Sequence, residues 1–357
     1  MLPPGSTIGI LGGGQLGRML ALAAAQLGFR THVYCPAAHS VAADVAARYT
    51  QAAWDDEPRL AAFAADCDAV TYEFENVPVD AVHYLSGHVA VRPGAAALDV
   101  AQDRLAEKRF VAGLGGKTAR FAPVPDRAAL DRALADIGTP AILKTVRLGY
   151  DGKGQARLMT PADADAAWDA IGRHPAVLEA FVDFSAEFSV ILARGIDGET
   201  RCWDSPHNVH DGGILSTSSL PPPAIVAEQQ GAARAIAAAI ADALDYVGVL
   251  TCEFFASAEG PVFNEMAPRV HNSGHWTIEG AVTSQFENHI RTIAGLPLGD
   301  TATRALPITM RNLIGEGIHD VPRLLADAHA HIHHYGKAEV RAGRKLGHVS
   351  WVGASPA

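Results

Sequence analysis

Apolar positions in the first hundred residues follow two alternating patterns. Short runs rich in Ile, Val and aromatic residues are typical of buried strands, and they occupy residues 6–11, 31–34, 69–72 and 88–91. Between them lie Ala-rich segments whose apolar residues recur at helical spacing, as in residues 16–23. Because strands alternate with helices, this part of the chain is predicted to form a parallel, doubly wound α/β sheet.

The pattern changes beyond residue 100, where predicted strands follow one another more closely. The segments predicted there are a helix at residues 104–113, strands at 141–144, 177–181, 188–193, 249–255 and 262–266, and an Ala-rich helix at 227–244. Residues 205–223 contain many Gly, Ser and Pro residues, and we expect a long loop there.

Composition narrows the classes of partner. The chain of 357 residues has a net charge of −10, so it has no electrostatic attraction for nucleic acid, and anionic substrates need locally positive pockets. The N-terminus lacks a basic segment, and the apolar run at residues 19–27 is too short to span a bilayer. The four cysteines show no C-x-x-C spacing. We therefore expect a cytoplasmic protein with reduced thiols and no membrane or nucleic-acid partner.

A glycine-rich turn follows the first predicted strand. Gly12, Gly14 and Gly17 satisfy G-x-G-x-x-G between a strand and a helix, which is the context of dinucleotide binding. That fingerprint also requires an acidic residue about twenty positions later, and residues 33–36 contain none. We retain a βα turn whose helix N-terminus suits phosphate, with Gln15 as a polar group for a ligand. A nicotinamide-dependent oxidoreductase is kept as an alternative.

Two glutamates on adjacent predicted strands form the strongest chemical signal. With Ala258 and Glu259 at the tip of the turn, Glu253 is expected opposite Asn264, one position from Glu265, and cross-strand neighbours lie about 5 Å apart. The flanking residues are apolar, and buried like charges are costly unless a cation neutralises them. Mg²⁺ prefers oxygen ligands and bridges carboxylates to phosphates. The pattern therefore favours a magnesium site over two solvent-facing glutamates.

Lysines and glycines suited to phosphate lie on another part of the chain. Lys144 ends a predicted strand, and Lys153 lies within the sequence GYDGKGQ at residues 149–155. The glycines let backbone amides approach phosphate oxygens and let the loop open and close. The chain contains no G-x-x-x-x-G-K-[ST], so an ATP site here is not of the Walker type. Residues 179–182 could form a hinge that reads adenine, with a carboxylate for the ribose.

Basic residues cluster just after the second glutamate. Arg269 and His271 fall in a loop punctuated by Pro and Gly, where they suit an anion clamp and a proton-transfer group. Arg344 and Lys345 form a second small basic turn. In an acidic chain, this turn is a candidate anion site.

These segments, in this order, resemble the ATP-grasp superfamily, and within it the family of N5-carboxyaminoimidazole ribonucleotide synthases. The matching segments are residues 12–20, 72–77, 102–108, 149–155, 207–210, 246–249, 264–276, 312–315 and 343–348. They cover nearly the whole chain. Residues 264–276 are the most specific, because relatives that use other amines differ there.

The resemblance implies a Rossmann-like (pre-ATP-grasp) N-terminal domain at residues 1–100, a two-lobed ATP-grasp domain at 101–295 and a small C-terminal domain at 296–357. It implies that ATP and bicarbonate carboxylate 5-aminoimidazole ribonucleotide to N5-carboxyaminoimidazole ribonucleotide, through carboxyphosphate, in purine biosynthesis. The implied cofactor is Mg²⁺, or Mn²⁺ in its place, and the implied assembly is a homodimer.

The family pattern also implies roles for individual residues. The metal ligands would be Glu253 and Glu265. The ATP contacts would be Arg104, Lys144, Gly149, Tyr150, Asp151, Gly152, Lys153, Gly154, Gln155, Glu179, Ala180, Phe181, Val182, Glu187, His210, Asn264 and Glu265. The ribonucleotide or bicarbonate would contact Gln15, Leu16, Glu73, Arg269, His271, Asn272, Arg344 and Lys345, with Arg269, His271 and Lys345 as catalytic residues.

Alternatives to this reaction come from different classes. Another ATP-grasp carboxylate–amine ligase, such as a formate-dependent glycinamide ribonucleotide transformylase, would share the ATP half of the site. A nucleotide-binding regulator would bind ATP without releasing phosphate in the presence of bicarbonate. A nicotinamide oxidoreductase would need the carboxylate that is missing from residues 33–36.

Overall fold

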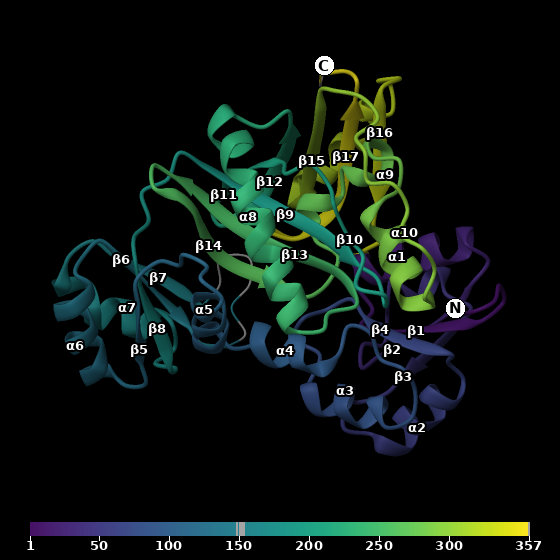
Figure 1. The fold of residues 1–357 in the computed structure, drawn as a ribbon, viewed down its shortest axis with the longest axis horizontal. Coiled ribbons are helices and arrows are strands. Elements are labelled where there is room, and N and C mark those ends of the chain that lie inside the picture. The colour runs from purple at the N-terminus through teal and green to yellow at the C-terminus, as the bar shows by residue number, and fades with distance from the viewer. Residues whose placement is uncertain (148, 150–153, 356–357) are drawn as a thin grey trace.

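The computed structural model describes residues 1–147, 149 and 154–355. Figure 1 shows a parallel sheet near the N-terminus, a small antiparallel sheet to one side, and a large sheet that continues into the C-terminal strands. The small sheet lies on the opposite side of the molecule from the N-terminal strands in this view (Figure 1). The mixed α/β architecture expected from the sequence is confirmed.

The N-terminal sheet is parallel throughout its described strands. Its order is β3 (Arg48–Gln51), β2 (Arg30–Cys35), β1 (Thr7–Leu11) and β4 (Ala69–Tyr72). Apolar residues of α1 (Gln15–Gln26) and α10 (Gln285–Ala294) join one core with it, and those of α2 (Glu57–Ala65), α3 (Val79–Ser86) and α4 (Ala95–Ala101) join another. Two cores on one parallel sheet confirm the doubly wound arrangement.

The predicted strand at residues 88–91 is wrong. Only Val91 pairs with the sheet, through a single parallel bridge to Val70. The N–H groups of His88 and Val89 both donate to the carbonyl of Leu85, at the end of α3. Because the helix end uses these donors, they cannot form a strand ladder.

The small lobe is an antiparallel sheet covered by two helices. Its order is β5 (Phe121–Val124), β8 (Ala176–Ala180), β6 (Ala141–Thr145) and β7 (Gln155–Leu158). Apolar residues of α6 (Arg127–Ile137) and α7 (Ala164–Ala170) share its core. The two strands predicted for this region agree with β6 and β8 to within about one residue at each end.

The large sheet spans the central and C-terminal parts of the chain. Within the described residues its order is β14 (Gly260–Ala267), β13 (Gly248–Ser257), β9 (Ala186–Arg194), β11 (His207–Asp211), β12 (Ile214–Leu220), β15 (Ile308–Ile314), β17 (Lys345–Val352) and β16 (Ala330–His334), with β10 (Thr200–Cys202) beside β9. The long helix α8 (Ala224–Ala243) packs across β9 and β13 (Figure 1).

The loop expected at residues 205–223 is wrong, because this segment contains the hairpin β11–β12. Leu215 and Leu220 are buried in it, but two other buried positions, Asn208 and Ser218, are polar. Asn208 donates to the hydroxyl of Ser189 at 2.7 Å and accepts from the hydroxyl of Ser218 at 2.8 Å. A strand whose buried face is satisfied by side-chain hydrogen bonds does not show the usual apolar alternation.

The remaining elements are short or connect the lobes. They are α5 (Arg104–Gly113), α9 (Thr277–Gly280), α11 (Val321–Leu324) and the 3₁₀ turns η1 (Ala43–Val45), η2 (Pro161–Asp163), η3 (Asn272–Gly274) and η4 (Gly315–Asp320). All four cysteines are free. Among the described helices, none combines the length and apolarity needed to cross a bilayer.

Helix α10 joins the N-terminal sheet to the large sheet through His289. The backbone N–H of Val249 donates to Nδ1 of His289 at 3.1 Å, so the neutral ring carries its hydrogen on Nε2. Nε2 therefore donates to the hydroxyl of Thr71 on β4, at 2.8 Å. The ring is fully buried, and burial lowers the pKa of His289 to about 3.

This contact predicts acid sensitivity. The folded-state pKa of His289 lies below its ordinary value, so only the unfolded chain takes up this proton as pH falls from 6.5 towards 3. His289 should stabilise the fold above pH 6.5 and lose that contribution across this window, by up to ~1.4 kcal/mol for each pH unit. Denaturant unfolding at a series of pH values measures the slope.

The slope should be smaller in His289→Gln, which cannot titrate. His39→Gln removes an exposed histidine and should keep the wild-type slope. Equal slopes in all three proteins would show that His289 is not responsible.

Candidate active site

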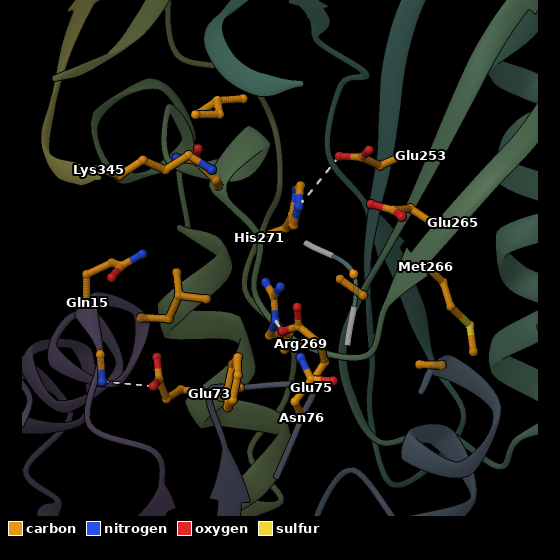
Figure 2. A pocket seen from close by; sticks show the side chains of 18 of the residues that line it. Gln15, Glu73, Glu75, Asn76, Glu253, Glu265, Met266, Arg269, His271 and Lys345 are labelled. Carbon is orange, nitrogen blue, oxygen red and sulfur yellow. Dashed lines mark hydrogen bonds and ion pairs between the residues drawn. The ribbon is translucent and has the colours of Figure 1, made fainter. Parts of the chain in front are cut away.

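The hairpin β13–β14 places two carboxylates directly opposite each other. Glu253 pairs with Glu265, whereas Phe254 pairs with Phe263, so Asn264 is an extra residue on β14. The expected pairing of Glu253 with Asn264 is therefore wrong by one position, because a β-bulge inserts one residue into the strand. Opposed residues point to the same face of a sheet. The bulge thus turns both carboxylates towards one cavity, where Figure 2 shows them side by side.

Their surroundings push the pKa values of the two carboxyl groups apart. Burial favours the neutral form of Glu265, but Arg104 and Lys144 outweigh it and lower its pKa. Arg104 donates to Oε2 of Glu265 at 3.0 Å. Burial and the charge of Glu265 raise the pKa of Glu253 to about 7. Glu265 is accordingly the more readily ionised of the two, and a bound cation would be needed to stabilise a negative charge on Glu253 as well.

A buried ion cluster of Lys108, Lys144 and Glu179 joins α5 to the small lobe. Glu179 on β8 lies 3.0 Å from the ammonium of Lys144 and 3.2 Å from that of Lys108. Burial would raise the pKa of Glu179, yet the two lysines lower it to about 2. Two cations around one anion leave a surplus positive charge, which suits phosphate oxygens.

The loop after β14 carries the basic residues predicted from the sequence. Arg269 pairs with the carboxylate of Glu75. His271 accepts the backbone N–H of Ser273 at Nδ1, at 3.3 Å, so its neutral ring carries the hydrogen on Nε2. Nε2 lies 3.5 Å from Oε1 of Glu253 (Figure 2). Burial, followed by the charge of Arg269, lowers the pKa of His271 well below its ordinary value, and the ring presents a neutral N–H to the cavity.

Gln285, which was not among the predicted site residues, fixes the backbone of this histidine. Its Oε1 accepts the N–H of His271 at 2.9 Å, and its Nε2 donates to the carbonyl of the same residue at 2.6 Å. The side chain is fully buried at the start of α10. A Cβ on Gly274 would lie 2.7 Å from the Gln285 amide, so a glycine is needed there. Only this three-dimensional contact reveals the role of the amide.

The glycine-rich turn serves a carboxylate from the same chain. Glu73 accepts the N–H of Gly14 at 2.8 Å and that of Gly17 at 3.1 Å. A Cβ on Gly12 would lie 2.6 Å from Oε1 of Glu73. Glu73 thus uses two of the N–H donors at this helix N-terminus, and a phosphate there stays a prediction. The same contact argues against a dinucleotide at the turn.

One cavity of about 630 Å³ brings many of the predicted residues together. The predicted residues that line it are Gln15, Leu16, Glu73, Arg104, Gly149, Glu253, Glu265, Arg269, His271, Asn272, Arg344 and Lys345. Figure 2 shows the two carboxylates on one wall, His271 and Arg269 between, and Gln15 and Lys345 on the other side. Lys337 and Arg341 also line it, and their scattered positions gave no sequence signal.

A smaller hollow adjoins Glu253 and holds three more predicted residues, Glu187, His210 and Asn264. Nδ1 of His210 lies 2.6 Å from Oε2 of Glu187. Other predicted ATP residues line neither space: Lys144 and Glu179 are buried in the ion cluster, and Gly154, Gln155, Ala180, Phe181 and Val182 lie elsewhere on β7 and β8 or beside them. Tyr150, Asp151, Gly152 and Lys153 lie outside the described residues.

The amide of Asn272 has partners in the protein. Asn272 and Asn312 exchange side-chain hydrogen bonds at 3.0 and 2.7 Å. The amide of Asn312 also donates to the carbonyl of Leu215. Asn272 therefore links the loop after β14 to β15 while it lines the cavity.

The oxygen donors near Glu253 suit a hard cation whose remaining coordination positions are filled by substrate phosphate. Across residues 1–147, 149 and 154–355, no three His, Cys, Asp or Glu side chains are grouped to hold a metal. The candidates are Glu253, Glu265 and the buried Oδ1 of Asn264, which has no hydrogen-bond partner. These are all oxygen donors, and Mg²⁺ is usually held by one or two carboxylates plus substrate phosphates. The residues present therefore fit Mg²⁺.

Comparison with known proteins covers nearly the whole chain. Models of three domains match: the ribonucleotide synthetase preATP-grasp domain at residues 5–102, the ATP-grasp domain at 109–286, and the phosphoribosylaminoimidazole carboxylase C-terminal domain at 309–357. The N5-carboxyaminoimidazole ribonucleotide synthase of Brucella melitensis is 51% identical over 352 residues, which are 98% of this chain and 97% of that protein.

Solved structures agree with this match. An ADP complex of an N5-carboxyaminoimidazole ribonucleotide synthetase superposes with a TM-score of 0.94 at 41% identity, covering 99% of this chain and 93% of that one. The Aspergillus clavatus synthase, in complex with ADP and 5-aminoimidazole ribonucleotide, gives 0.91 at 28% identity over 98% and 94%. The chain is an ATP-grasp ligase and belongs to the N5-carboxyaminoimidazole ribonucleotide synthase family.

Proposed function

We propose that this enzyme carboxylates 5-aminoimidazole ribonucleotide with bicarbonate and ATP, giving N5-carboxyaminoimidazole ribonucleotide, ADP and phosphate in purine biosynthesis. One observation carries the proposal: a single cavity joins the Glu253–Glu265 pair to Arg269, His271 and Lys345. Such a cavity suits a cation-bound phosphate at one end and an anionic ribonucleotide at the other. The Aspergillus clavatus relative, solved with ADP and 5-aminoimidazole ribonucleotide, supports this arrangement.

The ATP end of the site is assigned to the hairpin and the small lobe. Glu253 and Glu265 would hold Mg²⁺, or Mn²⁺ in its place, and the bound cation neutralises phosphate charge. Arg104 and Lys144 add positive charge for the phosphate oxygens. The remaining ATP contacts are assigned to residues 149–155 and 179–182, with Glu187, His210 and Asn264.

The first step is phosphoryl transfer to bicarbonate. An oxygen of bicarbonate attacks the γ-phosphorus of ATP, the bond to the β-phosphate oxygen breaks, and ADP and carboxyphosphate form. This step needs mainly positioning and charge stabilisation. Arg104 is already oriented towards Glu265 by its hydrogen bond, so its charge is in place before the substrates bind.

The second step forms the carbon–nitrogen bond. The exocyclic amine attacks the carboxyl carbon of carboxyphosphate, or CO₂ released from it, while phosphate leaves and the amine loses a proton. Arg269 would orient the anion. With its hydrogen on Nε2, His271 would act first as a hydrogen-bond donor to the developing negative charge. Lys345 is the other residue assigned to proton handling.

The ribonucleotide is assigned to the side of the cavity opposite the Glu253–Glu265 pair, where Figure 2 shows Gln15 and Lys345. Gln15, Leu16 and Glu73 would contact the ribose and base, and Arg344 and Lys345 the phosphate. Lys337 joins this basic group, since it lines the same part of the cavity and donates to the carbonyl of Lys345 at 2.9 Å.

Organisation beyond the site is proposed from the family. The family-domain matches at residues 5–102, 109–286 and 309–357 support domains at 1–100, 101–295 and 296–357. From the family we also infer a homodimer that acts on small molecules in the cytoplasm. The net charge of −10 fits the absence of a nucleic-acid partner.

The proposed reaction predicts a specific substrate dependence. Phosphate release from ATP should require bicarbonate and rise when 5-aminoimidazole ribonucleotide is added, with N5-carboxyaminoimidazole ribonucleotide detected as the product. Formate with glycinamide ribonucleotide should not replace this pair, and NADH should not bind. Phosphate release with formate and the glycinamide substrate, but not with bicarbonate, would assign the chain to another ATP-grasp ligase.

The carboxylate pair predicts a severe effect of Glu265→Gln. The substitution keeps the size of the side chain but removes the charge that faces the cation and Arg104, so turnover should fall on the order of 100-fold or more. Glu259→Gln, at the exposed tip of the same hairpin, should keep full activity. Retained turnover with normal Mg²⁺ dependence in Glu265→Gln would exclude the metal assignment.

The assignment of Lys337, Arg344 and Lys345 to the ribonucleotide phosphate predicts a selective effect of Lys337→Met. Loss of one charge-assisted contact to a phosphate should raise the KM for 5-aminoimidazole ribonucleotide roughly 10- to 100-fold and leave the KM for ATP unchanged. Arg323→Met removes a basic residue that pairs with Asp320 outside the cavity, and it should change neither constant. Equal rises in both KM values would contradict the assignment.

A further inference from the structure

One turn of α5 holds the segment of β14 that carries Glu265. Arg104, Glu107 and Lys108 are three and four residues apart, so they lie on one face of the helix. Arg104 contacts the carboxylate of Glu265, as described above. The other two contact the backbone on either side of it.

The two backbone contacts are complementary. Oε1 of Glu107 accepts the N–H of Met266 at 2.7 Å, and Nζ of Lys108 donates to the carbonyl of Asn264 at 3.3 Å. Their side chains are buried, with whole-residue exposures of 2% and 1%. Helix α5 thus supplies a donor to the residue immediately before Glu265 and an acceptor to the residue immediately after it.

The position of β14 explains why these contacts are needed. Among the described strands, β14 pairs only with β13 and forms the edge of the large sheet. An edge strand has outward N–H and C=O groups without a neighbouring strand, and a bulge interrupts the inner ladder as well. On the outer side of β14, Phe263 forms one bridge to Thr118, and its N–H donates to the carbonyl of Lys117 at 2.7 Å. Beyond this bridge, the contacts described for the outer side of the segment around Glu265 come from α5.

Lys108 also connects this edge to the small lobe. Its ammonium lies 3.2 Å from Glu179 on β8, the residue that also pairs with Lys144. A buried ammonium is costly unless it is fully paired. Its two contacts are a backbone carbonyl of the large sheet and a carboxylate of the small lobe.

We propose that Glu107 and Lys108 are positioning residues that hold the β14 bulge, so that Glu265 stays opposite Glu253 and both face the cation. This inference rests on the proposed ATP and Mg²⁺ site. Neither side chain is assigned a contact with substrate. Glu107 acts as a hydrogen-bond acceptor for the backbone, and Lys108 as a donor.

A matched pair of substitutions tests the role of Glu107. Glu107→Gln keeps an acceptor for the N–H of Met266, whereas Glu107→Met has similar size and keeps none. Calorimetric titration with ADP, with and without Mg²⁺, measures binding in the absence of turnover. The increase in ADP affinity that Mg²⁺ causes should shrink about tenfold in Glu107→Met and stay within about twofold of wild type in Glu107→Gln.

Kinetics add a second readout. The KM for 5-aminoimidazole ribonucleotide should stay unchanged in both variants, whereas the Mg²⁺ concentration for half-maximal activity should rise in Glu107→Met alone. A wild-type Mg²⁺ effect in Glu107→Met would overturn the proposal. An equal loss in Glu107→Gln would also overturn it, because the charge rather than the hydrogen bond would then be responsible.

Lys108→Met provides an independent test from the other side of Glu265. It should reduce the Mg²⁺ effect on ADP binding by a similar factor, and a wild-type value would overturn the role of Lys108. If Glu107→Met does not fold, as judged by circular dichroism, Lys108→Met and Glu107→Gln decide the outcome. A wild-type enzyme that binds Mg²⁺ and ADP but does not use bicarbonate would refute the proposed reaction and leave this inference standing.

Discussion

Two carboxylates opposed across a hairpin are the constraint on which the site depends. Glu253 and Glu265 lie on neighbouring strands with apolar residues around them, and each raises the cost of ionising the other. Arg104 pairs with Glu265, and a bound cation would offset the remaining repulsion. Other features of this end of the molecule support that arrangement: a bulge that aligns the two side chains, and a helix that holds the strand from outside.

The large sheet fixes the distance between the two ends of the reaction. It carries the carboxylate hairpin β13–β14 at one edge, and β17, which begins at Lys345, near the other. Because hydrogen-bonded strands connect them without interruption, Glu253, Glu265 and Lys345 belong to one continuous sheet. The small lobe is a separate sheet, and its Lys144 and Glu179 form a buried ion cluster with Lys108 of α5.

Sequence reasoning succeeded where chemistry follows from local pattern. The carboxylate pair was found because two glutamates interrupt apolar strands. The helix predicted at residues 104–113 agrees with α5, whose N-terminus the side chain of Asp103 caps in the structure. It failed where a long-range contact decides. The carboxyl group of Glu73 caps the glycine-rich turn from 59 residues away, and the amide of Gln285 holds His271 from 14 residues away. The bulge at Asn264 is local, but it leaves no mark in the residue types.

The glycine-rich turn shows why a motif needs its surroundings before it is given a function. The spacing of Gly12, Gly14 and Gly17 meets the dinucleotide pattern, but the small residues here make room for the carboxylate of Glu73. An anion from β4 occupies the helix N-terminus that a pyrophosphate would use. The same physical preference, backbone N–H groups for negative charge, is satisfied within the protein. Glu73 is consequently held at the cavity wall, with each carboxyl oxygen accepting one backbone N–H.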